Sequence, residues 1–182
     1  MAHDIEPVIF YCNPNIYPDE EYEIRKNEIT RYAHRLGLTI IEDDYDHAAW
    51  LRHIAGLESE PERGGRCLEC FKYRLLRSAR KAQELGIEEF TTTLASSRWK
   101  RLDQINAAGQ WAAAQVNALP AEPAVAEEGS VQSASGALAV HFDDRNWRKG
   151  GLQERRNELL RINGFYNQQY CGCEFSFRQP DP

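Results

Sequence analysis

The sequence predicts an α/β fold built in layers around a mainly parallel sheet, as a single domain over residues 1–182. Two observations lead to this prediction. Short apolar or β-branched segments alternate repeatedly with longer helical segments, an order typical of parallel sheets. In addition, 42% hydrophobic and 10% aromatic residues are enough for a buried core at this length. Ligands of such folds bind beyond the carboxyl ends of the strands.

Four segments are predicted as strands because they are short, apolar or β-branched, and bounded by turn residues. They are residues 8–11, 38–41, 90–94 and 140–142. The first strand is expected to end at Asn13-Pro14-Asn15, because proline cannot continue a central ladder.

Five segments between and after these strands are predicted as helices. They are residues 18–36, 47–54, 66–85, 99–114 and 152–162. Acidic residues after Pro18 favour the start of the first helix, because they complement its dipole. Ser96-Ser97 is the expected cap of the fourth helix, and glycine follows the end of each of the others.

Residues 117–139 break this pattern. The segment consists mostly of Ala, Pro, Glu, Gly and Ser and contains no aromatic residue. Such a composition is typical of linkers, so a flexible insertion is predicted here.

The composition also bears on the location of the protein. No apolar run approaches membrane-spanning length, and the first residues lack the basic and apolar regions of a signal peptide. Five cysteines, four of them clustered, in a chain without an export signal predict reduced thiols. We therefore expect a cytoplasmic protein.

The charge distribution bears on the partners. The net charge of −6 by itself argues against a nucleic-acid partner. However, residues 1–62 carry five basic and fourteen acidic side chains, whereas residues 63–110 carry ten basic and five acidic ones. A local basic face can bind a polyanion even on an acidic protein. A solvated helix face rich in Arg and Lys accounts for the pattern equally well.

Four cysteines form two tight pairs, Cys67/Cys70 and Cys171/Cys173. Each spacing lets two thiols point the same way, as in metal ligation or dithiol chemistry. Four interpretations stay open: an iron–sulfur cluster, a zinc site, a dithiol at the second pair that cycles to an oxidising disulfide, or inert thiols. Zinc fits less well, because its usual sites pair two C-x2-4-C knuckles. Cys12 stands alone and is expected to be a small buried side chain.

The first pair lies near the start of a predicted helix. The positive end of the helix dipole is expected to stabilise the thiolates of Cys67 and Cys70. Nearby cations are expected to add to this effect; they are Arg63, Arg66 and Lys72. In the second pair, Gly172 lets the backbone fold tightly around a bound group.

Two segments combine aromatic and basic side chains, which grip phosphates and stack on bases. The candidate nucleic-acid-binding residues are Arg98, Lys100, Arg101, Trp147, Arg148, Lys149, Arg155 and Arg156. Each segment taken singly is also typical of the start of an amphipathic helix. The sequence contains no P-loop, G-x-G-x-x-G, nucleophile elbow or H-E-x-x-H motif. Histidines such as His47 are expected to be surface or packing residues.

One set of motifs extends over most of the chain. They are Asn13-Pro14-Asn15-Ile16-x-Pro18-x-Glu20-Glu21-Tyr22, Arg66-Cys67-x-x-Cys70, Thr91-Thr92-Thr93-Leu94, Asn146-Trp147-Arg148-Lys149-Gly150-Gly151 and Tyr170-Cys171-Gly172-Cys173-x-Phe175-Ser176. With these motifs, residues 8–178 resemble the epoxyqueuosine reductases of the QueH family.

The resemblance implies a Rossmann-like three-layer fold and a cobalamin-independent oxidoreductase. The reaction it implies is reduction of epoxyqueuosine to queuosine at the wobble position of tRNA, with electrons from an unidentified donor. Cys67 and Cys70 would match ligands of a [4Fe-4S] cluster. Cys171 and Cys173 would match a catalytic pair, described either as a redox-active disulfide or as additional metal ligands. In the second case the metal would be an additional mononuclear iron.

One departure from the family pattern is expected to matter. The family opens with a strand, an adjacent Cys-Cys pair and a helix, whereas Met1 falls just ahead of the second strand. The first βα unit would then be missing, either from an incomplete sequence or from a shortened, non-catalytic zinc or iron–sulfur protein that binds tRNA. Loss of a central strand would expose apolar edges, so poor solubility or oligomerisation is expected.

Overall fold

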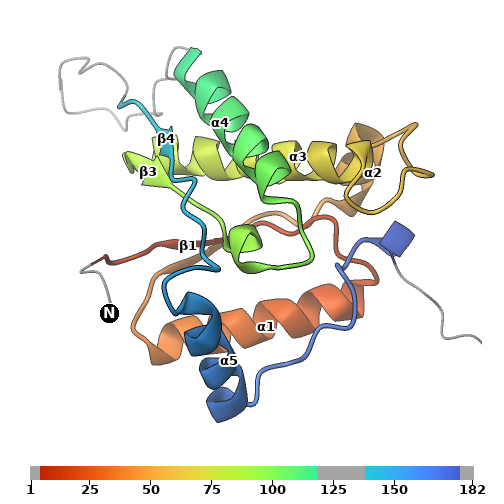
Figure 1. Cartoon of the computed structure of the whole chain (residues 1–182). Helices are drawn as coiled ribbons and strands as arrows, with labels where there is room; N and C mark the ends of the chain where they lie inside the picture. The colour runs from red at the N-terminus through yellow and green to blue at the C-terminus, as the bar shows by residue number, and fades with distance from the viewer. Residues whose placement is uncertain (1–4, 119–137, 177–182) are drawn as a thin grey trace, which may run out of the picture.

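The structure is a computed structural model that describes residues 5–118 and 138–176 (Figure 1). Within these ranges it contains four short strands and five α-helices. The strands form two parallel pairs, β1 (Ile9–Tyr11) with β2 (Ile40–Glu42) and β3 (Glu89–Phe90) with β4 (His141–Phe142). The predicted α/β class with parallel strands is confirmed, although the described strands form two separate pairs rather than one sheet.

The first pair is connected by α1 (Asp19–Arg35), close to the predicted bounds. Three acidic side chains in its first turn complement the positive end of the helix dipole. The chain leaves α1 through Gly37, whose φ of +69° suits a helix end. Tyr11, Ile16 and Tyr22 pack together beside this pair, so α1 is fixed against β1.

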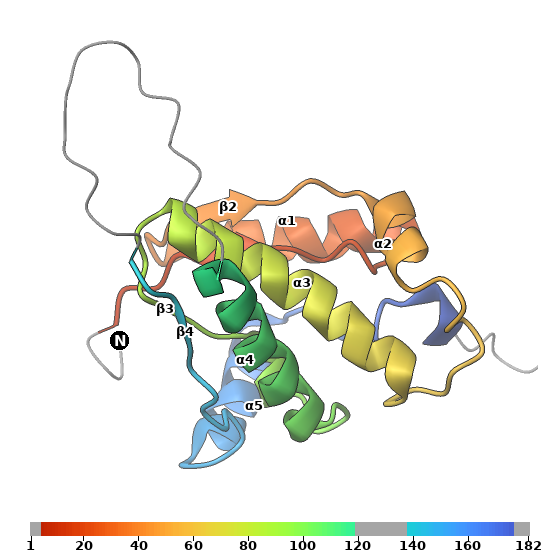
Figure 2. The same ribbon diagram turned by 90° about the horizontal axis from the view of Figure 1, so that it is seen from above.

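The second pair packs against two long helices, α3 (Gly65–Glu84) and α4 (Leu102–Ala118), which lie side by side (Figure 2). The main buried cluster of the described residues lies between these helices and the strands, and it includes the completely buried Ile105. Gly109 allows α4 to approach β4, because a Cβ there would come within 2.5 Å of the Phe142 ring.

Two shorter helices, α2 (His47–His53) and α5 (Leu152–Asn163), also match their predicted positions. Asp46 caps α2 by accepting a hydrogen bond from the Ala49 N–H at 2.7 Å. By contrast, α5 has no buried residue. None of the described helices combines the length and apolar character needed to cross a membrane.

The segment after β3 differs from its prediction. A strand is predicted over residues 90–94, but the pairing stops at Phe90, and Thr93–Ser96 forms a 3-10 turn. The Thr92 hydroxyl accepts a hydrogen bond from the Leu94 N–H at 3.2 Å. This local bond offers the backbone an alternative to the sheet ladder, which explains why the strand is short.

The bounds of α4 also differ from the prediction. The expected cap at Ser96-Ser97 is wrong, because the helix begins only at Leu102. It continues to Ala118, beyond the predicted end. The predicted insertion over residues 117–139 lies mostly outside the described residues, which exclude 119–137.

Candidate functional site

Cys67 and Cys70 lie on the first turns of α3, as predicted. The Cys67 sulfur accepts a hydrogen bond from the Arg63 backbone N–H at 3.2 Å. Cys70 is only 8% exposed. Burial raises the pKa of both thiols above the ordinary value for cysteine. Burial therefore outweighs the stabilisation of the thiolates that the helix dipole and nearby cations were expected to provide.

Those cations are held by other partners. The Arg66 guanidinium donates hydrogen bonds to the carbonyl oxygens of Glu58 and Glu60, at 2.6 and 2.5 Å. Lys72 pairs with Glu69 at 2.8 Å, one turn away on α3. The contacts of Arg66 fix the loop before α3, and both sets of contacts limit how strongly either cation acts on the thiols.

Lys100 lies at the second cysteine pair. Its Nζ donates a hydrogen bond to the Cys171 sulfur at 2.9 Å. Although burial opposes ionisation, this ammonium group lowers the pKa of Cys171 below its ordinary value. Burial raises the pKa of Cys173 to about 12. The two thiols are therefore unequal, and Cys171 is the one that ionises more readily.

The structure brings the two cysteine pairs together, although they are far apart in the sequence. Cys70 and Cys173 pack in one buried cluster with Trp50. Besides burial, negative charge on Cys171 raises the pKa of both Cys67 and Cys70. Cys70 and Cys173 therefore join the two pairs, and the charge of Cys171 acts on both thiols of the first pair.

The donor set of the two pairs has the chemistry of a soft-metal site, because thiolates are the ligands of iron–sulfur clusters and zinc. All five cysteines are free thiols. As the described side chains are placed, no three Cys, His, Asp or Glu residues gather as a ligand group. Cys12 lies outside the set: it is buried, as predicted, and burial and a hydrogen bond to Asp43 raise its pKa.

A buried ion pair on α1 holds the loop that carries Cys171. Arg25 donates hydrogen bonds to the carbonyl oxygens of Tyr170 and Cys171, at 3.1 and 3.3 Å. The same guanidinium pairs with Glu21 at 2.7 Å. The second oxygen of Glu21 accepts the Tyr166 hydroxyl at 2.8 Å. Sequence reasoning missed these residues, because an i, i+4 pair of opposite charges usually marks an exposed helix face.

Gly172 closes this loop against the start of α1. Its φ is +99°, and its carbonyl oxygen accepts the Tyr17 N–H at 2.8 Å. A Cβ at this position would lie 2.8 Å from Ile16 Cγ1 and 3.0 Å from Arg25 Nη1. Glycine is therefore needed both for the backbone angle and for the close approach.

His47 connects the Asn-Pro-Asn turn to the cysteine loop. Its Nδ1 is 2.7 Å from the Pro14 carbonyl oxygen, and its Nε2 is 3.1 Å from the Glu174 carboxylate. The imidazole also stacks on Trp50, with ring centroids 5.3 Å apart. It is a packing residue, as predicted, but its two polar contacts were not foreseen.

Three of the predicted nucleic-acid-binding residues contact residues that are distant in the sequence. Besides Lys100, the Arg148 guanidinium donates to the carbonyl oxygens of Ala95 and Lys100, at 3.1 and 2.9 Å. The Trp147 indole N–H donates to the Thr91 hydroxyl at 3.2 Å. These contacts fix the turn that presents Lys100 to Cys171.

The other predicted residues are exposed, and they are Arg98, Arg101, Lys149, Arg155 and Arg156. Two of them already form surface ion pairs, Arg101 with Asp103 and Arg155 with Glu158. Trp99, next to Arg98, is 69% exposed. These side chains remain accessible to a large anionic partner.

Comparison with known proteins identifies the family. The model of the family described as epoxyqueuosine reductase QueH matches residues 1–179. The epoxyqueuosine reductase QueH of Histophilus somni is 40% identical over 177 residues, and the match covers 97% of this chain and 64% of that protein. The corresponding proteins of Haemophilus influenzae and Acinetobacter baylyi are 39% and 38% identical, with 98% and 96% of this chain covered.

The chain spans 64% and 70% of the length of these two relatives, respectively, so it matches about two thirds of each protein. The matched region includes both cysteine pairs and the α1 residues that hold the second pair. The resemblance found in the motifs is confirmed, and the chain belongs to the epoxyqueuosine reductase QueH family.

Proposed function

We propose that this protein is an oxidoreductase that reduces epoxyqueuosine to queuosine at the wobble position of tRNA. The names of its relatives support the reaction. The observation that carries the proposal is the packing of Cys70, from the first cysteine pair, with Cys173, from the second, together with the ammonium group of Lys100 on the Cys171 sulfur. Such a cluster of thiols suits electron transfer better than any other chemistry of the described residues.

The reaction needs two electrons and two protons, because the epoxide oxygen leaves as water and an alkene forms. An outside donor must supply the electrons. We propose that Cys67 and Cys70 supply two of the ligands of a [4Fe-4S] cluster, a group that would supply electrons one at a time. Cys171 and Cys173 would then act either as a redox-active pair or as additional ligands, for instance to a mononuclear iron. No cobalamin is required.

The chain's own residues would prepare this site. Lys100 lowers the pKa of Cys171 and so favours the thiolate, the form that binds metal or attacks a disulfide. Arg25 fixes the backbone on either side of the same sulfur. Burial of Cys70 and Cys173 keeps water from the sulfurs.

We also propose that the tRNA contacts the exposed basic side chains on both sides of Lys100. Lys149 is the best probe among the predicted residues, because it is exposed, whereas Arg148 is needed inside the protein. Lys149→Ala is expected to weaken tRNA binding and to lower its salt dependence. Equal salt dependence of tRNA binding in wild type and Lys149→Ala would show that Lys149 does not contact the tRNA.

The arrangement of the strands supports a Rossmann-like three-layer fold. All four described strands pair in parallel, and helices pack against both pairs. We propose that the two parallel pairs form the sheet layer of this fold and that the thiol site lies beyond the carboxyl ends of their strands.

Anaerobic reconstitution with iron and sulfide tests the cofactor. Wild-type protein is expected to develop charge-transfer absorption in the visible region, and Cys67→Ser and Cys70→Ser are expected to lose most of it. Cys12→Ala is the matched control, because that thiol lies outside the cluster. One bound zinc without visible absorption would favour the alternative of a non-catalytic tRNA-binding protein.

A single-turnover assay tests the reaction. Reconstituted protein, a chemical reductant and tRNA carrying epoxyqueuosine are incubated, and the nucleosides are then separated and identified by mass spectrometry. Queuosine should appear with wild-type protein and with Cys12→Ala, but not with Cys171→Ser. Absence of queuosine from a fully reconstituted wild-type sample would refute the proposed reaction for this chain.

A further inference from the structure

The segment after α5 runs back along α1, as Figure 1 shows. From the thiol end outward, the contacts pair Arg25 with Cys171, Glu28 with Tyr166, Tyr32 with Phe165 and Arg35 with Asn163. A helix rises about 1.5 Å per residue, so the ten residues from Arg25 to Arg35 span about 15 Å. The far end of this contact is therefore connected to the thiol site through one rigid helix.

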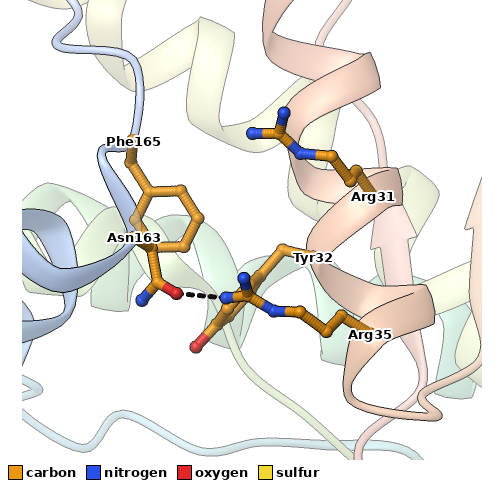
Figure 3. Close-up of a pocket in the computed structure, with 5 residues that line it drawn as sticks. All are labelled: Arg31, Tyr32, Arg35, Asn163 and Phe165. Atoms are coloured by element: carbon orange, nitrogen blue, oxygen red, sulfur yellow. Dashed lines mark hydrogen bonds between the residues drawn. The ribbon is translucent and has the colours of Figure 1, made fainter.

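A cavity of about 270 Å³ opens at that far end (Figure 3). Its lining residues are Arg31, Tyr32, Arg35, Asn163 and Phe165. Both guanidinium groups point from α1 toward the side of Asn163 and Phe165. No carboxylate lines the cavity, and neither arginine forms an ion pair with any residue that the structure describes.

Among the described residues, neither of these two positive charges is paired with a carboxylate. Arg31 and Arg35 lie one turn apart on one helix face, a spacing at which like charges repel. Arg35 is already oriented, because its guanidinium lies 4.9 Å from the Tyr32 ring centroid and donates to the Asn163 side chain. An oriented, planar guanidinium matches the oxygens of a phosphate group.

The size and the walls of the cavity indicate the kind of anion. Pockets for complete small molecules usually measure about 300–1,000 Å³, so this cavity suits a single group of a larger molecule. Tyr32 and Phe165, in an edge-to-face contact at 4.7 Å, offer aromatic surface on which a base could stack. Phosphate and base together are the features of an RNA strand.

We propose that the cavity between α1 and the end of α5 binds a backbone phosphate of the substrate RNA, about 15 Å along α1 from the residue that holds Cys171. This inference rests on the proposed function, since it assumes an RNA substrate. Exposed Arg155 and Arg156 lie earlier on α5, so the strand would follow this helix from the predicted basic turn to the cavity. The site would fix the orientation of the tRNA on the protein.

Fluorescence anisotropy with a labelled tRNA mixture, at several salt concentrations, tests the site on the full chain. The double variant Arg31→Ala/Arg35→Ala is expected to bind tRNA about tenfold more weakly at low salt, as for loss of a charge-assisted contact of about 1.4 kcal/mol. The slope of log Kd against log salt should fall by about 0.7–0.9 for one lost phosphate contact. The matched control is Arg52→Ala/Arg80→Ala, which removes two exposed arginines elsewhere.

Each outcome decides the inference. Equal weakening by both double variants would show only a loss of net charge and would overturn the site. If wild-type protein binds no tRNA, both the RNA substrate and the site are refuted, whereas tRNA binding unaffected by the cavity variant refutes the site alone. Arg31→Glu is a second variant, since this exposed side chain can change without loss of a described contact, and it should weaken binding further.

Discussion

Gly172→Ala is the change that most directly tests how the cysteine loop is held. An alanine at φ +99° adopts a backbone region that costs about 1–2 kcal/mol for residues with a Cβ. The new methyl group would also lie 2.8 Å from Ile16 Cγ1 and 3.0 Å from Arg25 Nη1. Both neighbours are buried, so relieving this contact should cost a further 1–3 kcal/mol, as for other overpacked cores, on the order of 2–5 kcal/mol together.

The free energy of unfolding in urea measures this cost. Gly151→Ala is the matched control, because Gly151 has a φ of +79° but no atom within 4 Å of the point that a Cβ would occupy. In this control variant the free energy of unfolding should fall only by the cost of the backbone conformation, about 1–2 kcal/mol. Equal losses in the two variants would contradict the close approach of Gly172 to α1. Faster alkylation of Cys171 in Gly172→Ala alone would show that the loop has moved.

Two further changes probe charged contacts. Lys100→Met should raise the pKa of the Cys171 thiol, since the ammonium group that counteracts the effect of burial is removed. The pH dependence of Cys171 alkylation, followed by peptide mapping, should therefore shift to higher pH. An unchanged profile would disprove the contact. Asp43→Asn should lower the free energy of unfolding at neutral pH by about 1–3 kcal/mol, because a charged hydrogen-bonded pair with Arg77 is lost. Although burial opposes it, Arg77 lowers the pKa of Asp43, so this contribution is complete above the unfolded pKa of aspartate and disappears as the pH falls through the folded value. The difference between wild type and variant should therefore shrink on acidification, and a constant difference would contradict the assignment.

The sequence was sufficient for the elements whose signals are local. The bounds of α1, α2, α3 and α5 follow from acidic first turns, caps and glycine ends, and all four lie within about two residues of their predictions. The strand predicted over residues 90–94 was wrong in its length, although its signals are also local. Three threonines favour a strand by propensity, but the Thr92 side chain forms a local hydrogen bond that ends the ladder.

Of the candidate site, the sequence alone predicted only the cysteines. The spacing of the cysteines identified both pairs, whereas the partners of those pairs depend on contacts between distant parts of the chain. Lys100 lies 71 residues from Cys171, and Arg25 lies 146 residues from it. No local pattern distinguishes such residues from ordinary surface charges, so only the folded chain shows that they serve the thiols.

Arg148 connects the thiol site to the exposed turn around Lys149. Its guanidinium holds the carbonyl oxygen of Lys100, whose ammonium group contacts Cys171, while its neighbour Lys149 faces solvent. A ligand that binds the turn around Lys149 and shifts Arg148 would alter the hold of Lys100 on the sulfur. Such coupling is reciprocal by thermodynamic necessity, so a chemical change at Cys171 would alter affinity at the turn by the same factor. The affinity of the turn for its ligand would then differ between the free and the reacted state of Cys171.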